Sequence, residues 1–542
     1  MADIEVPVLV VGGSLVGMST AMLLGRQGIS TFVAEHHRGT AIHPRAAQIL
    51  QRTMEILRTV GVEQLVMQKS EEQFTQDGAI MAVETLAGKE LTWFFRNLND
   101  GVRDVSPSIR LFITQNLLEP LLKARAEELG SQIHFGTEMM SFEEDTHGVT
   151  AQMRERDTGR TFSVRAKYMV AADGAHSPIR ERLGIRMRGH GVFSKCITIY
   201  FRGEMAPLLR GRNLSVIYVV NSVLSGFIRI EKPFQSGFLV VFWLGNPKNP
   251  VTDVSSGLTN EKCLEYLHAA LGTRDVPLTI ENVMHWDATA DVAERFQHGR
   301  IFLAGDAAHV MPPTGGFGGN TGVQDAHNLA WKLALVLKGA ADPRLLASYE
   351  AERLPASAFT VEQAYSRYVT RSAPFLGTDH IQPIVDDLNI DLGYCYHSAA
   401  VVADDEDKVH LHDNPRETRG RPGTRAPHLF LERNGRQIST LDLFGGNFVL
   451  LAGPGRSAWC ESGRIAGKTL GIPMDVHQIG ADGLSDPSGN FASTYGMTPT
   501  GAVLVRPDGF VAWRARSGES ATPATLARVL ATLLCREVSF RS

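Results

Sequence analysis

Cysteines are few in this sequence, and their spacing does not indicate a disulfide or a metal site. Five cysteines are scattered over 542 residues, with no CxxC pair and no spacing typical of a zinc site. The odd number and wide separation are also unlike a disulfide framework. Metal binding and dithiol chemistry are therefore not indicated, and a reducing cytoplasm is the expected compartment.

The sequence also lacks an excess of positive charge and long apolar runs. Lys and Arg number 54 against 58 Asp and Glu, a net charge of −4, so nothing favours nucleic acid or an anionic membrane as a partner. No apolar run reaches the roughly 18 residues of a membrane span. The start, MADIEVPVLVV, has no basic segment and reads as a buried strand rather than a signal peptide. We expect no nucleic acid and no membrane as partners.

Glycine, by contrast, is abundant, and its first cluster lies in a strand–turn–helix pattern. An apolar strand over residues 7–11 leads into Gly12, Gly13, Ser14, Leu15, Val16 and Gly17, which open a helix. A dinucleotide pyrophosphate needs such a tight turn, with close backbone approach and free N–H groups at a helix start. Glu35 ends the next strand, where a carboxylate can accept hydrogen bonds from ribose and would repel a 2′-phosphate.

Ser14 departs from the usual GxGxxG pattern because it stands at the second glycine. Its hydroxyl is small and could face a phosphate. The motif alone leaves two interpretations open, a dinucleotide site or an ordinary tight turn. An NAD-dependent dehydrogenase would need this motif alone, which would leave a second segment, GDAAH at residues 305–309, without a function.

Two distant segments repeat the combination of a strand, an acid and a glycine. Asp173 and Gly174 follow YMVAA and begin DGAHSPIR, while Asp306 lies in GRIFLAGDAAH, which VMPPTGGFGGN follows. Either aspartate alone would more often be a helix N-cap. Together the segments indicate a grip on phosphate or polyhydroxyl groups.

With these three motifs in order, nearly the whole chain resembles the class A flavoprotein monooxygenases, the p-hydroxybenzoate hydroxylase-like FAD-dependent aromatic hydroxylases. The branch it is most similar to is that of phenol 2-monooxygenase and the polyketide-tailoring hydroxylases. The resemblance implies that Gly12–Gly17 and Glu35 hold the ADP half of FAD. It also implies roles near FAD for Arg45, Gln115, Met139, Asp173, Gly174, Ser177, Arg180, Asp306 and Pro313 and for the backbone of Gly318, Gly319 and Asn320. Ile179 replaces the usual valine of DGxxSxVR.

The same resemblance predicts an α/β fold of three parts. A Rossmann-like FAD-binding domain would comprise residues 1–187 and 285–400, with a mostly antiparallel β-rich substrate domain inserted at 188–284 and joined by strands near 76–110. After a linker at 401–427, residues 428–542 resemble a thioredoxin-like domain. Cys460 has no nearby thiol partner, so this domain is expected to be structural or associative. A homodimer is left open.

The activity implied is hydroxylation of an electron-rich aromatic ring, with NAD(P)H and O2 as co-substrates and a flavin C4a-hydroperoxide as oxidant. The long substrate segment and the third domain resemble those of enzymes that act on fused-ring polyketides, which implies a polycyclic polyketide-type substrate. Phe193, Phe227, Phe242 and Trp243 are candidate pocket aromatics, and we expect adjacent Phe242 and Trp243 to point to opposite faces of one strand. No acid or base is assigned, since Tyr200 and Tyr218 do not align with the family tyrosines.

Two other functions remain compatible with these residues. A Baeyer–Villiger insertion on the same fold is not separable by sequence, although FxGxxxHxxxW and the halogenase motif WxWxIP are absent. A flavin-binding accessory protein without redox activity is the other. His36-His37 and His410-x-His412 lack the further ligands of a metal site and are interpreted as solvated loop residues.

Overall fold

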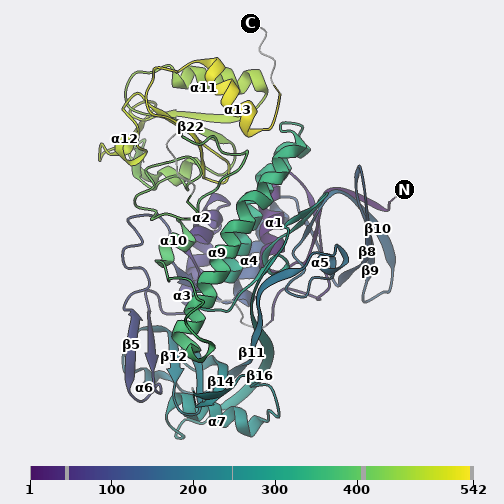
Figure 1. The fold of residues 1–542 in the computed structure, drawn as a ribbon, viewed down its shortest axis with the longest axis vertical. Helices are drawn as coiled ribbons and strands as arrows, with labels where there is room; N and C mark the ends of the chain where they lie inside the picture. The colour runs from purple at the N-terminus through teal and green to yellow at the C-terminus, as the bar shows by residue number, and fades with distance from the viewer. Residues whose placement is uncertain (1, 43–47, 247, 405–409, 538–542) are drawn as a thin grey trace.

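The computed structural model describes residues 2–42, 48–246, 248–404 and 410–537. Three parts follow one another along the long axis of the molecule (Figure 1). A sheet with helices lies in the middle, a second sheet lies at the bottom of the view, and the C-terminal part lies at the top. The long helix α9 (Ala347–Ser372) runs diagonally from beneath the C-terminal part to the second sheet.

The central sheet has eight strands and brings the ends of three distant segments to one edge. Its order is β17-β18-β10-β1-β2-β7, with β9 beside β10 and β8 beside β9. The strands are β1 (Ile4–Val11), β2 (Thr31–Glu35), β7 (Gln132–Phe135), β8 (Thr137–Asp145), β9 (Gly148–Glu155), β10 (Thr161–Ala171), β17 (Gln297–His298) and β18 (Ile301–Leu303). Because β1, β2, β10 and β18 run parallel, their carboxyl ends share one edge. The Rossmann-like α/β arrangement predicted from the sequence is confirmed.

Helices surround this sheet and its edge. The first strand ends in four buried residues, as expected of a central parallel strand. Helix α1 (Leu15–Arg26) packs between α4 (Gln115–Glu128) and α8 (Phe317–Leu337). The other helices of this part are α2 (Gln51–Thr59), α3 (Glu63–Gln73), α5 (Pro178–Arg182) and α10 (Asp387–Asp391), and two short strands pair beside them, β3 (Gln48–Ile49) and β6 (Leu111–Phe112).

The second sheet is mostly antiparallel and has nine strands. Its order is β19-β16-β11-β14-β13-β12-β4-β5, with β15 beside β14. The strands are β4 (Ala79–Val83), β5 (Glu90–Phe95), β11 (Met187–Arg202), β12 (Leu214–Val220), β13 (Leu224–Glu231), β14 (Ser236–Asn246), β15 (Asn249–Val251), β16 (Thr279–Ala293) and β19 (His309–Val310). One face packs on α7 (Asn260–Leu271), and the short helix α6 (Ala206–Leu209) lies at its rim. The other face turns toward the central sheet.

A β-bulge in this sheet corrects one expectation. Strand β14 pairs Trp243 with Ser225 but Val241 with Gly226, so Phe242 is the extra residue. A bulge breaks the simple alternation of side chains. Phe242 and Trp243 therefore pack into the same buried cluster instead of pointing to opposite faces.

The C-terminal part has a four-stranded sheet in the order β23-β22-β25-β26, with only β22 and β23 parallel. Its main elements are β22 (Phe448–Ala452), α11 (Trp459–Leu470), β23 (Met474–Gln478), β25 (Ala502–Val505), β26 (Val511–Ala515) and α13 (Pro523–Leu533), with smaller elements β20 (Phe430–Arg433), β21 (Arg436–Ser439), β24 (Leu484–Ser485) and α12 (Phe491–Thr494). Cys460 lies in the first turn of α11, and burial raises the pKa of its thiol. A thiol kept protonated and unpaired among the described residues is not suited to disulfide exchange.

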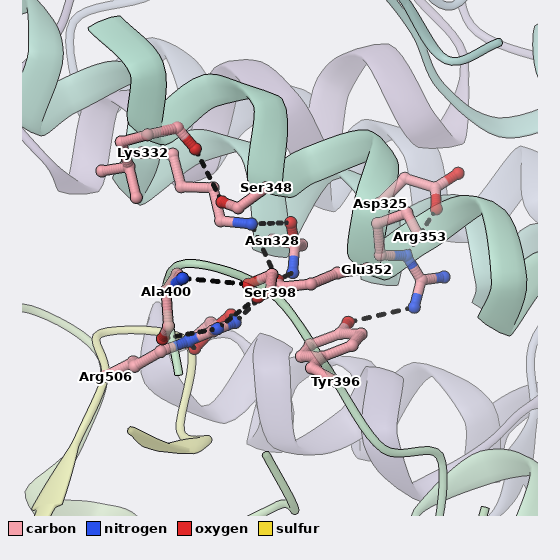
Figure 2. A network of polar contacts seen from close by, with 12 residues as sticks. Asp325, Asn328, Lys332, Ser348, Glu352, Arg353, Tyr396, Ser398, Ala400 and Arg506 are labelled. Carbon is pink, nitrogen blue, oxygen red and sulfur yellow. Dashed lines mark hydrogen bonds and ion pairs between the residues drawn. The ribbon is translucent and has the colours of Figure 1, made fainter. Parts of the chain in front are cut away.

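A buried network of charges joins the C-terminal part to the central helices (Figure 2). Arg506 donates to Glu352 of α9 at 2.6 and 3.0 Å, and Lys332 of α8 donates to the same carboxylate at 2.7 Å. All three side chains are fully buried. Burial opposes ionisation of Glu352, but Arg506 and Lys332 outweigh it and hold the pKa of Glu352 well below its usual range. Asp508 also pairs with Arg506, so the charges balance within the network.

A second pair reinforces this junction. Arg425 donates to both carboxylate oxygens of Glu55 on α2, and both side chains are buried. Residues 410–427, expected to be a linker, contain neither a helix nor a named strand, yet this arginine anchors them to the central part. The C-terminal part is therefore held by paired charges in a buried interface.

Removing one cation from the network should destabilise the whole protein. Replacement Arg506→Met leaves Glu352 and Asp508 short of positive charge inside the protein, a loss of about 3–5 kcal/mol in the free energy of unfolding. Urea unfolding of the FAD-loaded protein, followed by tryptophan fluorescence, measures the change. Lys123→Met, which removes an exposed ion pair with Glu127 on α4, is the control and should cost at most about 1 kcal/mol. Equal effects of the two changes would contradict a structural role for the network.

Candidate cofactor and substrate site

The turn between β1 and α1 is built so that backbone atoms lie at the surface of the site. Gly12 has a φ of +104°, and a Cβ there would lie 2.1 Å from the carbonyl oxygen of Ala172. A Cβ on Gly17 would lie 1.8 Å from the carbonyl oxygen of Gly12. Both positions therefore require glycine. The first N–H groups of α1 have no partner within the helix, which makes this turn an anion site.

Ser14 directs its hydroxyl toward α4. Its Oγ donates to Glu119 Oε1 at 2.5 Å and accepts from Gln115 Nε2 at 2.6 Å. Glu119 Oε2 also accepts from the backbone N–H of Ala41 at 2.6 Å. The hydroxyl thus ties the glycine turn to α4, a use that differs from the phosphate contact considered above. Sequence reasoning missed Glu119, although its i, i+4 spacing from Gln115 placed both on one helix face.

Glu35 lies at the carboxyl end of β2, beside the same turn. Its two oxygens accept backbone N–H groups of Gly13 and His37, each at 2.7 Å. The side chain is buried, and a carboxylate keeps further lone pairs after two such bonds. Its place fits the predicted ribose contact, which stays a prediction.

The DGAHSPIR segment connects the end of β10 with the GDAAH loop. Asp173 Oδ2 accepts the N–H of Ile179 at 3.3 Å, while its buried Oδ1 has no partner within the described structure. Burial raises the pKa of Asp173, although Ser177 and Ile179 counteract it. Arg180 donates to the carbonyl oxygens of Ala307 and Ala175 at 3.0 and 2.9 Å. An unused buried acceptor is a reason to expect a ligand hydroxyl there.

Asp306 follows β18 and lies on the wall of a cavity. Its loop is held from behind by the fully buried Asp325 of α8. Asp325 accepts the N–H of Gly305 at 3.0 Å, His309 Nε2 at 2.7 Å and Arg353 Nε at 2.8 Å. Burial works against its charge, but His309 and Arg353 keep the pKa of Asp325 low. Sequence reasoning did not identify Asp325, because a buried aspartate inside a helix gives no motif.

The cavity has a volume of about 440 Å³ and lies between the two sheets. On one side it is lined by Leu15, Asp306 and Pro313 and by the start of α8 at Gly318, Gly319 and Asn320. The opposite wall comes from the second sheet. Its apolar members include Ile80, Phe95, Val216, Phe227, Phe238 and Val240, and its polar members include Tyr200, Tyr218 and Arg229. Predicted cofactor residues and an aromatic-lined pocket thus meet in one space.

Of the four predicted pocket aromatics, Phe227 lines this cavity. Phe193, Phe242 and Trp243 are absent from its described lining and pack behind it against α9 and the segment after it. Phe193 and Phe242 contact Tyr368, and Trp243 Nε1 donates to the carbonyl oxygen of Ser372 at 2.5 Å. The aromatic content of these strands did not reveal which side chains face the cavity.

The predicted contacts of two other residues stay untested. Arg45 falls outside the described residues, so its predicted flavin contact is untested. Met139 lies on β8, where it is partly buried against the central core. Its contact with adenine stays a prediction.

Comparison with known proteins agrees with this arrangement. Residues 5–364 match the family described as "FAD binding domain", and residues 419–536 match "Aromatic-ring hydroxylase, C-terminal". The 4-methyl-5-nitrocatechol 5-monooxygenase of Burkholderia sp is 50% identical over 539 residues, covering 98% of each chain. The tetracenomycin A2 monooxygenase-dioxygenase of Streptomyces glaucescens is 38% identical, with 95% of this chain and 94% of the relative covered.

A solved structure of aklavinone-11 hydroxylase with FAD and aklavinone is similar over 99% of this chain and 100% of that one, with a TM-score of 0.91 and 36% identity. The chain belongs to the FAD-dependent aromatic-ring hydroxylases. It is a monooxygenase with FAD as cofactor and with NAD(P)H and O2 as co-substrates. The glycine turn, the unpartnered Oδ1 of Asp173 and the cavity position of Asp306 fit FAD. No described helix has the length and apolar character that a membrane crossing needs.

Loss of the Asp306 carboxylate should weaken FAD retention. Asp306→Ala removes a charged acceptor for a ribityl hydroxyl, so we expect FAD affinity to fall roughly 10- to 100-fold. Flavin fluorescence after ultrafiltration gives the dissociation constant. Asp157→Ala, an exposed aspartate paired with Arg38, should leave that constant unchanged. Unaltered FAD affinity in Asp306→Ala would contradict the assignment.

Restoring the missing glycine tests the role of Ser14. Because the Ser14 hydroxyl bonds to Gln115 and Glu119, Ser14→Gly should keep FAD affinity within about threefold, with a loss of roughly 1 kcal/mol in stability. The same ultrafiltration assay and a urea titration provide both values. A large loss of FAD affinity with unchanged stability would show that the hydroxyl serves the cofactor instead.

Proposed function

We propose that the protein hydroxylates a single-ring phenol or catechol whose hydroxyl is made acidic by an electron-withdrawing substituent. The observation that carries the proposal is the cavity in which Asp306 and Pro313 face an aromatic wall. The 50% identical relative, whose name states a nitrocatechol substrate, supports this substrate class. The flavin ring must share the 440 Å³ space, which also favours a small substrate.

In this proposal each side of the cavity has its own task. The glycine turn, Glu35, Asp173 and Asp306 hold FAD, and the start of α8 with Pro313 positions its ring. Bound FAD supplies the activation of O2. Ile80, Phe95, Phe227 and Phe238 would hold a planar ring and exclude water from it.

Tyr218 is the proposed hydrogen-bond donor to a ring oxygen. It lines the cavity from β12 and is nearly completely buried. Burial raises the pKa of Tyr218, and Arg371 only partly opposes this. The phenol therefore stays protonated at neutral pH and can donate to a substrate oxygen.

A polycyclic phenol is the second candidate, since the structural neighbour was solved with aklavinone and another relative is named for tetracenomycin. Baeyer–Villiger chemistry at the same site remains an alternative to hydroxylation. We further propose that the protein works in the cytoplasm without nucleic acid. Whether the protein forms a homodimer can be tested by measuring its molar mass by light scattering after size-exclusion chromatography.

Turnover with a panel of rings tests the proposal. The FAD-loaded protein is mixed with NADH or NADPH and with 4-methyl-5-nitrocatechol, 4-methylcatechol or aklavinone, and NAD(P)H oxidation, O2 uptake and peroxide are recorded. We expect the nitrocatechol to stimulate both rates most, with little peroxide and an oxygenated product by mass spectrometry. Preference for aklavinone would select the second candidate. Flavin that no nicotinamide reduces would indicate an accessory protein and refute the proposal.

A further inference from the structure

Arg229 is a cation on the cavity wall that the functions described above do not use. It lies on β13, on the same face as Phe227, and is paired in register with Phe238 of β14. Its neighbours Ile228 and Ile230 point the other way, into the core against α7. The side chain is 4% exposed and lines the cavity.

The guanidinium of Arg229 lacks the partners that other buried arginines have. Its Nε and Nη2 make no hydrogen bond with any described residue, and it forms no ion pair within the described structure. Arg353 and Arg506, by contrast, each pair with a buried carboxylate. A charge buried without a partner is costly. The unpaired charge of Arg229 therefore indicates that a ligand binds beside it.

Two aromatic rings explain how the cation is tolerated before a ligand binds. The guanidinium carbon lies 3.9 Å from the ring centre of Phe112 and 4.7 Å from that of Phe74. These cation–π contacts offset part of the desolvation cost. Burial lowers the pKa of Arg229 to about 9, while Glu231 on the same strand opposes the shift. The side chain remains a cation at neutral pH.

We propose that Arg229 is the anion-binding residue of the substrate pocket and holds an ionised ring oxygen or an acidic substituent of the aromatic substrate. This inference rests on the proposed function. A guanidinium presents a planar fork of donors that matches two oxygens, as in a nitro or carboxylate group, or a single phenolate oxygen. Bound beside this cation, a ring hydroxyl ionises more readily, and an ionised oxygen makes the ring richer in electrons. Arg229 would thus select acidic substrates and favour their reactive form.

Other ionisable groups share the cavity and must be separated from Arg229 in any experiment. Those on its wall are Tyr200, Tyr218, His285, Asp306, Arg371 and Asp387. Arg371 is the matched control because it is a second cation in the same cavity but is only partly buried. A partly exposed charge is screened by solvent and contributes less to binding.

The test compares an acidic and a neutral probe in binding experiments. 4-Nitrocatechol has a hydroxyl that ionises near neutral pH and a coloured anion, whereas 4-methylcatechol stays neutral. With Arg229→Met, the affinity for 4-nitrocatechol should fall roughly 30-fold or more, while that for 4-methylcatechol should change by no more than about threefold. Arg229→Lys should recover part of the loss, and Arg371→Met should cause a smaller one. FAD content and the melting temperature of each variant verify the fold.

The spectrum of bound 4-nitrocatechol gives an independent result with the unaltered protein. We expect the bound probe to be the coloured anion at pH values where the free probe is largely protonated. Binding of the neutral form, equal losses for both probes, or a larger anion-specific loss in Arg371→Met would overturn the role of Arg229. Benzoate binding, read from the flavin absorption, tests Arg229 separately, because Arg229→Met should weaken it whether or not a catechol is hydroxylated. A failure to hydroxylate any catechol would refute the proposed function alone.

Discussion

The buried carboxylate of Asp325 is the interaction on which the site depends. It holds the backbone of Gly305, and hence the loop that carries Asp306, against α8. The same carboxylate pairs with Arg353 of α9, which in turn donates to Tyr396 at 3.1 Å (Figure 2). Arg353 also donates to the carbonyl oxygen of Thr321. A loop is thereby positioned by two rigid helices. The residue before Arg353, Glu352, carries the contact with the C-terminal part, so one turn of α9 serves both tasks.

This arrangement gives the C-terminal part a physical role without redox chemistry. Arg506 of this part and Arg425 of the segment before it insert into the central part and neutralise Glu352 and Glu55. Cations and carboxylates in this interface are matched, and their mutual attraction compensates for the water they have lost. Arg229 differs because its charge has no such match, and the cavity beside it is open to a ligand. Paired charges thus build the scaffold, and an unpaired charge marks the substrate pocket.

Much of the fold could be predicted from sequence because its signals are local. Glycines after a strand indicate close backbone approach, and Gly12 and Gly17 have that role. Parallel strands then bring Asp173 and Asp306 to one edge. Long-range contacts gave no such signal, so Glu119, Asp325 and Arg506 were missed. The orientation expected for Phe242 and Trp243 was wrong because a bulge depends on the partner strand, and the position of Arg229 follows only from the assembled sheet.

The protein is expected to use FAD at this edge to transfer one oxygen atom from O2 to a ring held against the aromatic wall. The most direct measurement is mass spectrometry of the product after turnover with isotopically labelled O2 and 4-methyl-5-nitrocatechol. We expect one labelled oxygen atom in the product for each NAD(P)H consumed. A product without label, or labelled peroxide with an unchanged ring, would contradict it.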